Sequence, residues 1–206
     1  YSDLTALLLA IHARTGLVTF HGPTALSDWS AFTLDWARRV LFEGEAPTYR
    51  NVLVEDGRLV PRRWRTQVVT PGRASGRLLG GNLSLVSHLV GTPYMPDLSG
   101  AILFLEDVSE AVYSIDRMLT QLWLSGDLAK CSGIVFGKFT EIASSAWVQN
   151  RLLEEVLVER VRALNIPSVM GLMIGHVPDQ TTVPLGCLAE LDASAGTLTL
   201  LEAPVK

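Results

Sequence analysis

One short apolar run constrains the fold of this chain more than any other feature. Residues Ile102 to Leu105 are all large and hydrophobic, and Glu106 and Asp107 follow them directly. Consecutive apolar residues without alternation are typical of a strand that is buried on both faces, as in a parallel sheet covered by helices. The stretches on either side alternate between β-rich segments and segments with helical spacing. The sequence therefore predicts an α/β fold.

The expected helices have apolar residues three or four positions apart, a polar cap in front and, in several cases, glycine behind. They span residues 4–15, 29–43, 83–90, 112–125 and 147–161, with Ser27 or Asp28 as the expected cap of the second and Asn82 as that of the third. The expected strands are 17–20, 67–70, 77–79, 102–105, 134–136 and 169–174, followed by a closing hairpin of 188–191 and 197–201.

Composition excludes several classes of protein. The 206 residues are 48% hydrophobic, which suits one large domain or two small ones with a buried core. The net charge of -4 provides no basic field for a nucleic acid. No apolar run approaches the roughly 20 residues that a bilayer requires, so we expect no membrane segment. Cys131 and Cys187 lie alone in apolar surroundings and are expected to be reduced core thiols.

Residues 44–65 differ in character from the rest of the chain. Glycine and proline punctuate this stretch, and residues 51–65 are the predicted linker between two domains. Arg62, Arg63 and Arg65 near its end are interpreted as a solvated strand edge rather than as an anion site. The chain begins at Tyr1 without methionine, and we expect a further segment upstream.

Ser2 and Glu106 each lie where an element begins or ends, which is where rigid scaffolds present reactive groups. Ser2 directly precedes a helix, so it is either a nucleophile at a strand-to-helix turn or an ordinary N-cap. Glu106 leaves a buried strand with Asp107 and Glu110 nearby, and these acids need a cation, hydrogen-bond donors or a helix N-terminus. The residues alone leave these alternatives open.

His176 lies in a loop after a predicted strand, between Gly175 and Pro178. Histidine titrates near neutrality, so one held in a constrained loop makes a good general base. His12, His21 and His88 are interpreted as structural or surface residues, and no pair of histidines has metal-binding spacing. A serine, a histidine and a carboxylate form a hydrolytic set only if the fold brings them together, because triads occur in several chain orders.

Several blocks together resemble the LD-carboxypeptidase family of serine peptidases, which includes the microcin-immunity peptidases. The resemblance covers the chain from Ser2 almost to its end. The blocks are Gly80-Gly81-Asn82-Leu83-Ser84-Leu85, Gly91-Thr92-Pro93-Tyr94, Ile102-Leu103-Phe104-Leu105-Glu106-Asp107-Val108, Tyr113-Ser114-Ile115-Asp116-Arg117-Met118-Leu119, Gly133-Ile134-Val135-Phe136-Gly137 and Gly175-His176.

The resemblance implies a catalytic triad. The family's nucleophile lies in a Gly-x-Ser-Asp segment, which matches Ser2 although the leading glycine is absent from this sequence. The family's acid and base correspond to Glu106 and His176. The backbone N–H of Asp3 would be one oxyanion donor, and the other is expected from a glycine upstream. Candidates for binding the substrate carboxylates are Gly80, Gly81 and Asn82, with a helix N-cap as the alternative role of Asn82.

The resemblance also implies the architecture. Residues 1–50 would be the tail of an N-terminal flavodoxin-like or amidotransferase-like α/β domain that holds the serine. Residues 66–206 would be a C-terminal α/β domain with a barrel-like, swivelling sheet that carries Glu106 and His176. The 206 residues by themselves are expected to be inactive.

The implied activity is removal of the terminal D-Ala from cytosolic murein tetrapeptides at an L,D-amide bond, during cell-wall recycling in the cytoplasm. No metal or organic cofactor is implied, and a homodimer is usual for the family. One alternative is an immunity peptidase that cleaves peptidyl nucleotides, which would need an exposed aromatic platform; Trp123 and Trp147 are instead expected in the core. The other alternative is an inactive fragment or binding domain.

Overall fold

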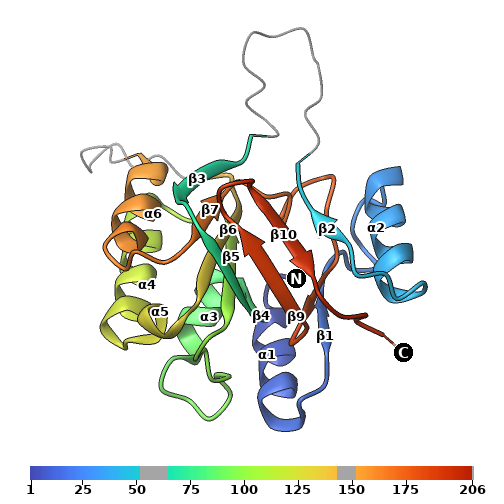
Figure 1. Ribbon diagram of the computed structural model, residues 1–206, viewed down its shortest axis with the longest axis horizontal. Helices are drawn as coiled ribbons and strands as arrows, with labels where there is room; N and C mark the ends of the chain where they lie inside the picture. Colours follow the sequence, from blue (N-terminus) through green and yellow to red (C-terminus); the bar gives the residue numbers. More distant parts are fainter. Residues whose placement is uncertain (52–64, 143–151, 206) are drawn as a thin grey trace, which may run out of the picture.

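The computed structural model describes residues 1–51, 65–142 and 152–205, and it has the predicted α/β architecture. One mixed sheet of eight strands forms its centre (Figure 1). In spatial order the strands are β2 (Thr48–Tyr49), β10 (Thr197–Leu200), β9 (Leu188–Asp192), β4 (Arg73–Asn82), β5 (Ile102–Val108), β6 (Gly133–Thr140), β7 (Ser168–Met170) and β3 (Gln67–Thr70). A separate ribbon pairs β1 (Thr19–His21) with β8 (Val183–Leu185).

Strand β4 joins two parts of the sheet. Its first half, residues 73–77, pairs antiparallel with β9, and its second half, residues 78–82, pairs parallel with β5. Gly76 lies at the changeover, where a Cβ atom would overlap the backbone oxygen of Gly100. The sheet can therefore curl tightly at this point, and the result is a half-barrel.

Helices connect the parallel strands β4 to β7, as crossover connections require. Figure 1 shows these helices together on one side of the parallel strands. They are α3 (Leu83–Leu89), α4 (Val112–Leu124), α5 (Asp127–Lys130) and α6 (Leu153–Arg162). Helix α1 (Leu4–Thr15) packs against β1, β4 and α3, whereas α2 (Ala31–Leu41) lies apart, beyond β2.

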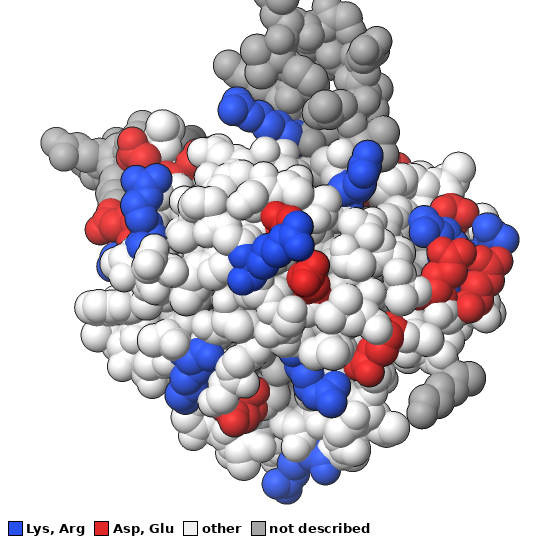
Figure 2. All heavy atoms as spheres, in the orientation of Figure 1, with Lys and Arg blue, Asp and Glu red and all other residues white. Residues whose placement is uncertain are grey.

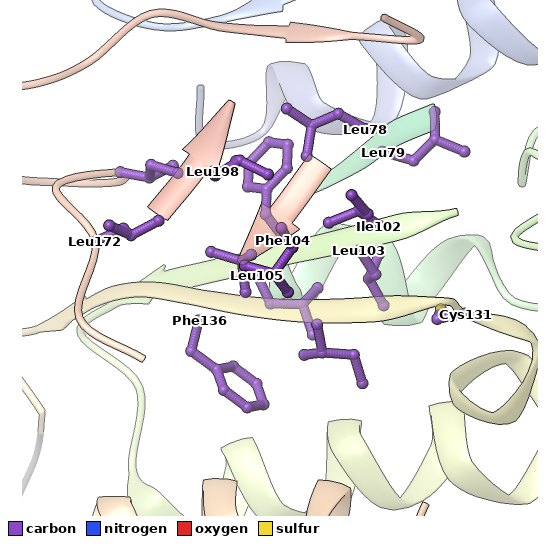
Figure 3. Packing of buried hydrophobic residues seen from close by; sticks show 14 of the residues in the cluster. Leu78, Leu79, Ile102, Leu103, Phe104, Leu105, Cys131, Phe136, Leu172 and Leu198 are labelled. Atoms are coloured by element: carbon purple, nitrogen blue, oxygen red, sulfur yellow. The ribbon is translucent and has the colours of Figure 1, made fainter. Parts of the chain in front are cut away.

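The core lies on both faces of the parallel strands. Residues Ile102 to Leu105 of β5 and Phe136 of β6 have no solvent exposure, so the prediction of a strand buried on both faces is confirmed. Figure 3 shows the side chains leaving both faces, with Phe136 directed toward the helices. Cys131 and Cys187 are buried free thiols, as expected. Burial raises their pKa to about 12 and about 11, respectively.

Some helix boundaries differ from the expectation. The cap of α2 is Ser30 rather than Ser27 or Asp28, because the Ser30 hydroxyl accepts the backbone N–H of Thr33. The predicted start of the last helix at residue 147, including Trp147, lies outside the described residues. Trp123 is 47% exposed near the end of α4, so its expected place in the core is wrong.

Strands also extend beyond their expected limits. Strand β5 continues to Val108, which places Glu106 inside the strand rather than after it. Strand β2 lies within the stretch 44–65 and pairs with β10. Strand β8 was not predicted, because Pro184 and Gly186 in and beside it resemble turn residues. The predicted linker at 51–65, with Arg62 and Arg63, falls almost entirely outside the described residues.

The surface carries no concentration of one charge in the view of Figure 2, where basic and acidic side chains are interspersed among uncharged residues. On α2 and the turn after it, for example, Arg38 pairs with Glu43 and Arg39 with Glu45. Among the described helices, none combines the length and apolar character needed to cross a membrane.

The fold predicts that alanine destabilises the protein much more at Gly80 than at Gly91. Gly80 has φ of 131°, and a Cβ atom there would overlap the backbone oxygen of Phe104, whereas Gly91 has φ of 80° and open space around it. Gly80→Ala should lower the free energy of unfolding by about 3 kcal/mol through strain and overlap. Gly91→Ala should cost about 1 kcal/mol from its conformation alone. Urea denaturation of both variants measures the difference, and equal losses would contradict this account.

Candidate active site

Glu106 lies at an irregularity in the pairing of β5 with β6. Leu105 pairs with Phe136 but Asp107 pairs with Phe139, so Glu106 faces the extra residue that β6 carries at this point. Bulges of this kind redirect side chains and are common beside active sites. The Glu106 side chain is fully buried. A carboxylate in such a place requires close polar partners, because burial without them is very costly.

His176 is the first of those partners. Its Nδ1 atom lies 2.7 Å from Oε2 of Glu106. A carboxylate oxygen only accepts, so Nδ1 carries the proton and Nε2 is left as the basic nitrogen. Gly175 makes the approach possible, because it has φ of 120° and a Cβ atom there would lie 2.6 Å from the Glu106 carboxylate. The structure therefore brings together two of the three residues predicted for the triad.

Ser2 has an unusual backbone conformation. Its φ is 58°, a left-handed value that only a few non-glycine residues of the described chain adopt. It is not the N-cap of α1, because Asp3 occupies that position and Ser2 precedes it. A nucleophile on a sharp turn into a helix has this arrangement. The backbone N–H of Asp3 donates to no backbone carbonyl among the described residues, as an oxyanion donor requires.

Tyr1 connects Ser2 with the histidine. Its ring packs edge-on against the ring of His176, with the centroids 4.5 Å apart. Within the described residues the Ser2 hydroxyl forms no hydrogen bond, so it lies next to a residue that contacts His176 without itself being bonded to the imidazole. In the absence of substrate, catalytic hydrogen bonds are often long or unformed.

His21 also lies next to Glu106, although the sequence analysis interpreted it as a structural or surface residue. It ends β1, is 1% exposed, and its Nε2 lies 3.6 Å from Oε1 of Glu106. Burial lowers its pKa well below the usual value. In the sequence, His21 stands at a strand end directly before Gly22, and His176 stands directly after Gly175. A neighbouring glycine is too weak a pattern to distinguish His21 from His12 as a functional residue.

Asp107 points to the opposite face of β5 from Glu106, since successive side chains of a strand alternate. It accepts hydrogen bonds from the Asn82 amide (2.7 Å) and from the backbone and hydroxyl of Ser84 (3.0 and 2.9 Å). These donors, rather than a cation, satisfy Asp107. In the described part of the chain, no group of three or more histidine, cysteine, aspartate or glutamate residues could hold a metal ion.

The proposed carboxylate binders have structural roles in this arrangement. Asn82 caps α3, because its side-chain oxygen accepts the N–H of Leu85, while its amide donates to Asp107. Gly80 and Gly81 are buried and permit close packing, Gly80 against the backbone of β5 and Gly81 against the Thr5 side chain. Thr5 also accepts the N–H of Asn82, which fixes the first turn of α1 below Ser2. The structure thus favours the N-cap alternative for Asn82.

The loop after His176 is held by the N-terminus of α2. Ser30 donates to the Asp179 carboxylate at 2.7 Å. Thr33 donates its hydroxyl proton to the carbonyl of Pro178 and accepts the N–H of Gln180. Residues far apart in the sequence thereby fix the position of the imidazole.

Residues 75–191, more than half of the chain, match the family model described as the LD-carboxypeptidase C-terminal domain. The chain belongs to the LD-carboxypeptidase family. A putative carboxypeptidase of Synechocystis sp. is 38% identical over 98% of this chain and 62% of its own length. A probable murein peptide carboxypeptidase of Bacillus subtilis is 36% identical over 97% of this chain. The chain covers 61% of that protein.

Solved structures of LD-carboxypeptidase relatives have the same fold. A muramoyltetrapeptide carboxypeptidase from Oxalobacter formigenes is 35% identical, with a TM-score of 0.80 over 97% of this chain and 66% of its own. The microcin C7 self-immunity protein MccF in its wild-type apo state is 27% identical, with a TM-score of 0.84 over all of this chain and 67% of its own. The chain spans about three fifths of the length of the curated relatives named above.

The hydrogen bond from Ser30 to Asp179 anchors the loop that follows His176, and its removal should affect both stability and activity. Ser30→Ala removes both the cap of α2 and the hydrogen bond to Asp179, so the free energy of unfolding should fall by about 1 kcal/mol. The loop should also loosen, and kcat of the full-length protein on the substrate proposed below should fall several-fold. Ser27→Ala, in the turn before α2, is the matched control. Thermal unfolding and steady-state kinetics measure the two effects, and a Ser30→Ala variant with unchanged kcat would show that the anchor does not position the histidine.

Proposed function

We propose that this protein is a serine peptidase that removes the terminal D-Ala from murein tetrapeptides at an L,D-amide bond. The observation that carries the proposal is the buried Glu106–His176 pair, whose imidazole packs against Tyr1, the residue before a serine held in a left-handed turn at the start of α1. Family membership and the names of two relatives, the murein peptide carboxypeptidase and the muramoyltetrapeptide carboxypeptidase, support the choice of substrate.

The mechanism assigns each member of the triad one task. Ser2 Oγ attacks the carbonyl carbon of the L,D-amide while Nε2 of His176 accepts its proton. Glu106 holds the imidazole through Nδ1 and stabilises the imidazolium. The N–H of Asp3 donates to the oxyanion, a contribution of roughly 3 kcal/mol for each such donor. His176 then returns the proton to the amine of D-Ala, which leaves. A water molecule then gives a proton to His176 and attacks the carbonyl carbon of the resulting ester. The bond from that carbon to Ser2 Oγ breaks, His176 returns the proton to Ser2 Oγ, and the shortened peptide leaves.

The remaining implications of the family belong to the same proposal. Residues 1–50 would form part of the nucleophile domain and residues 66–206 the second domain, with 51–65 between them. The protein would act in the cytoplasm as a homodimer, without a metal or cofactor. An inactive binding domain is the opposite possibility, and saturable binding of the tetrapeptide without turnover by the full-length protein would favour it.

Replacing the nucleophile tests the proposal directly. Ser2→Ala in the full-length protein should abolish release of D-Ala from a purified murein tetrapeptide, because no other hydroxyl replaces the attacking oxygen. The thermal midpoint should stay nearly unchanged, since the Ser2 hydroxyl forms no hydrogen bond among the described residues. Ser99→Ala, in an exposed loop, is the matched control and should retain full activity. Turnover by Ser2→Ala at the wild-type rate would refute the assignment.

A second candidate function uses the same triad on a peptidyl nucleotide. It is favoured by the TM-score of 0.84 with MccF, which exceeds the 0.80 with the muramoyltetrapeptide carboxypeptidase, although the sequence identity is lower. The kcat/KM values for a murein tetrapeptide and for a peptidyl adenylate separate the two functions. We expect the tetrapeptide to have the higher value by at least about tenfold, and the reverse order would establish the nucleotide substrate instead.

A further inference from the structure

His21 is a buried histidine that the proposed mechanism does not use. It faces Oε1 of Glu106, whereas His176 faces Oε2 of the same carboxylate. Within the described residues, Oε1 and both ring nitrogens of His21 are buried and have no hydrogen-bond partner. Buried polar atoms are almost always paired, so this constellation requires an explanation.

The rings around His21 fix its orientation. Phe104, two residues before Glu106 on β5, packs edge-on against it with the centroids 5.3 Å apart. Tyr1 contacts it from another side, with the centroids 6.3 Å apart and an interplanar angle of 67°. His21 is also fixed through its backbone, because it pairs with Val183 of β8. The imidazole therefore has little freedom to turn away from Glu106.

The distance between His21 and Glu106 is slightly longer than a hydrogen bond. From 3.6 Å, a shift of about 0.5 Å would bring Nε2 and Oε1 within bonding range. The tautomer with its proton on Nε2 presents an N–H donor to the otherwise unpaired oxygen. The torsion that rotates a carboxylate is soft, so an oxygen without a partner allows the group to turn. A donor on Oε1 would hold Oε2 on His176.

We infer that His21 is a positioning residue that donates from Nε2 to Oε1 of Glu106 and so keeps the other carboxylate oxygen on the His176 imidazole. This inference rests on the proposed function for its kinetic consequence but not for its structural one. Burial keeps His21 uncharged by lowering its pKa, which suits the role. A cationic His21 would compete with the His176 imidazolium for the single negative charge of Glu106.

Substitutions of His21 by glutamine, asparagine and phenylalanine distinguish a hydrogen-bond donor from a residue that only fills space. The amide nitrogen of His21→Gln reaches the place of Nε2, whereas the shorter side chain of His21→Asn does not. His21→Phe fills the ring volume without a donor. In the full-length protein, we expect His21→Gln to keep most of the wild-type kcat. His21→Asn and His21→Phe should lose roughly ten- to hundredfold, because the base is misplaced. KM should change little, because His21 is buried and presents no surface to a substrate.

A spectroscopic measurement needs no substrate. The proton on Nδ1 of His176 should give a resolved downfield NMR signal in the full-length protein, which His176→Gln removes. The signal should persist in His21→Gln and broaden or vanish in His21→Asn and His21→Phe. His88→Gln, at an exposed histidine of α3, is the matched control and should leave the signal in place.

The outcomes separate the inference from the proposed function. If the wild type releases no D-Ala but the signal follows the expected pattern, the proposed function fails and the positioning role stands. If His21→Phe retains the signal and His21→Gln loses it, His21 only fills space and the inference is overturned. Equal signals in all three variants also overturn it. Should His21→Phe not fold, the comparison of Gln with Asn gives the same decision.

Discussion

The burial of one carboxylate governs the arrangement of the whole site. Glu106 has no contact with solvent, so the groups around it must supply what water would otherwise provide. His176, at 2.7 Å, meets that requirement at one carboxylate oxygen. His21, from a different part of the chain, lies 3.6 Å from the other oxygen and is the donor that we infer for it. Gly175 is necessary because any larger residue would displace the carboxylate.

The same requirement explains why distant segments converge. The imidazole of His176 sits on a loop, and loops are mobile unless contacts hold them. The N-terminus of α2 supplies those contacts through Ser30 and Thr33, while Thr140 of β6 donates to the carbonyl of His176 at 3.1 Å. On the other side, Thr5 and Gly81 fix α1 to the end of β4. Residues of the first fifty positions are therefore structural parts of a site whose acid and base lie much later.

Features that depend on neighbouring residues could be predicted from the sequence. The buried run of β5, the cap at Asn82, the glycine that ends α1 and the hairpin of β9 and β10 all follow from periodicity and capping, and each was predicted. The cap of α2 was missed because Ser27, Asp28 and Ser30 are all suitable cap residues, and only the hydrogen bond from the Thr33 N–H to the Ser30 hydroxyl distinguishes them. His21 could not be selected either, because its importance depends on a carboxylate 85 positions away, a contact that no local pattern encodes.

Because strand β4 belongs to both parts of the sheet, it couples their local unfolding. One continuous chain segment is hydrogen-bonded to the β9–β10 hairpin along its first half and to the parallel strands along its second. Neither half can fray without disturbing the other, so the two should exchange their amide protons as one cooperative unit. The C-terminal hairpin thus belongs to the cooperative unit on which the alignment of the imidazoles depends.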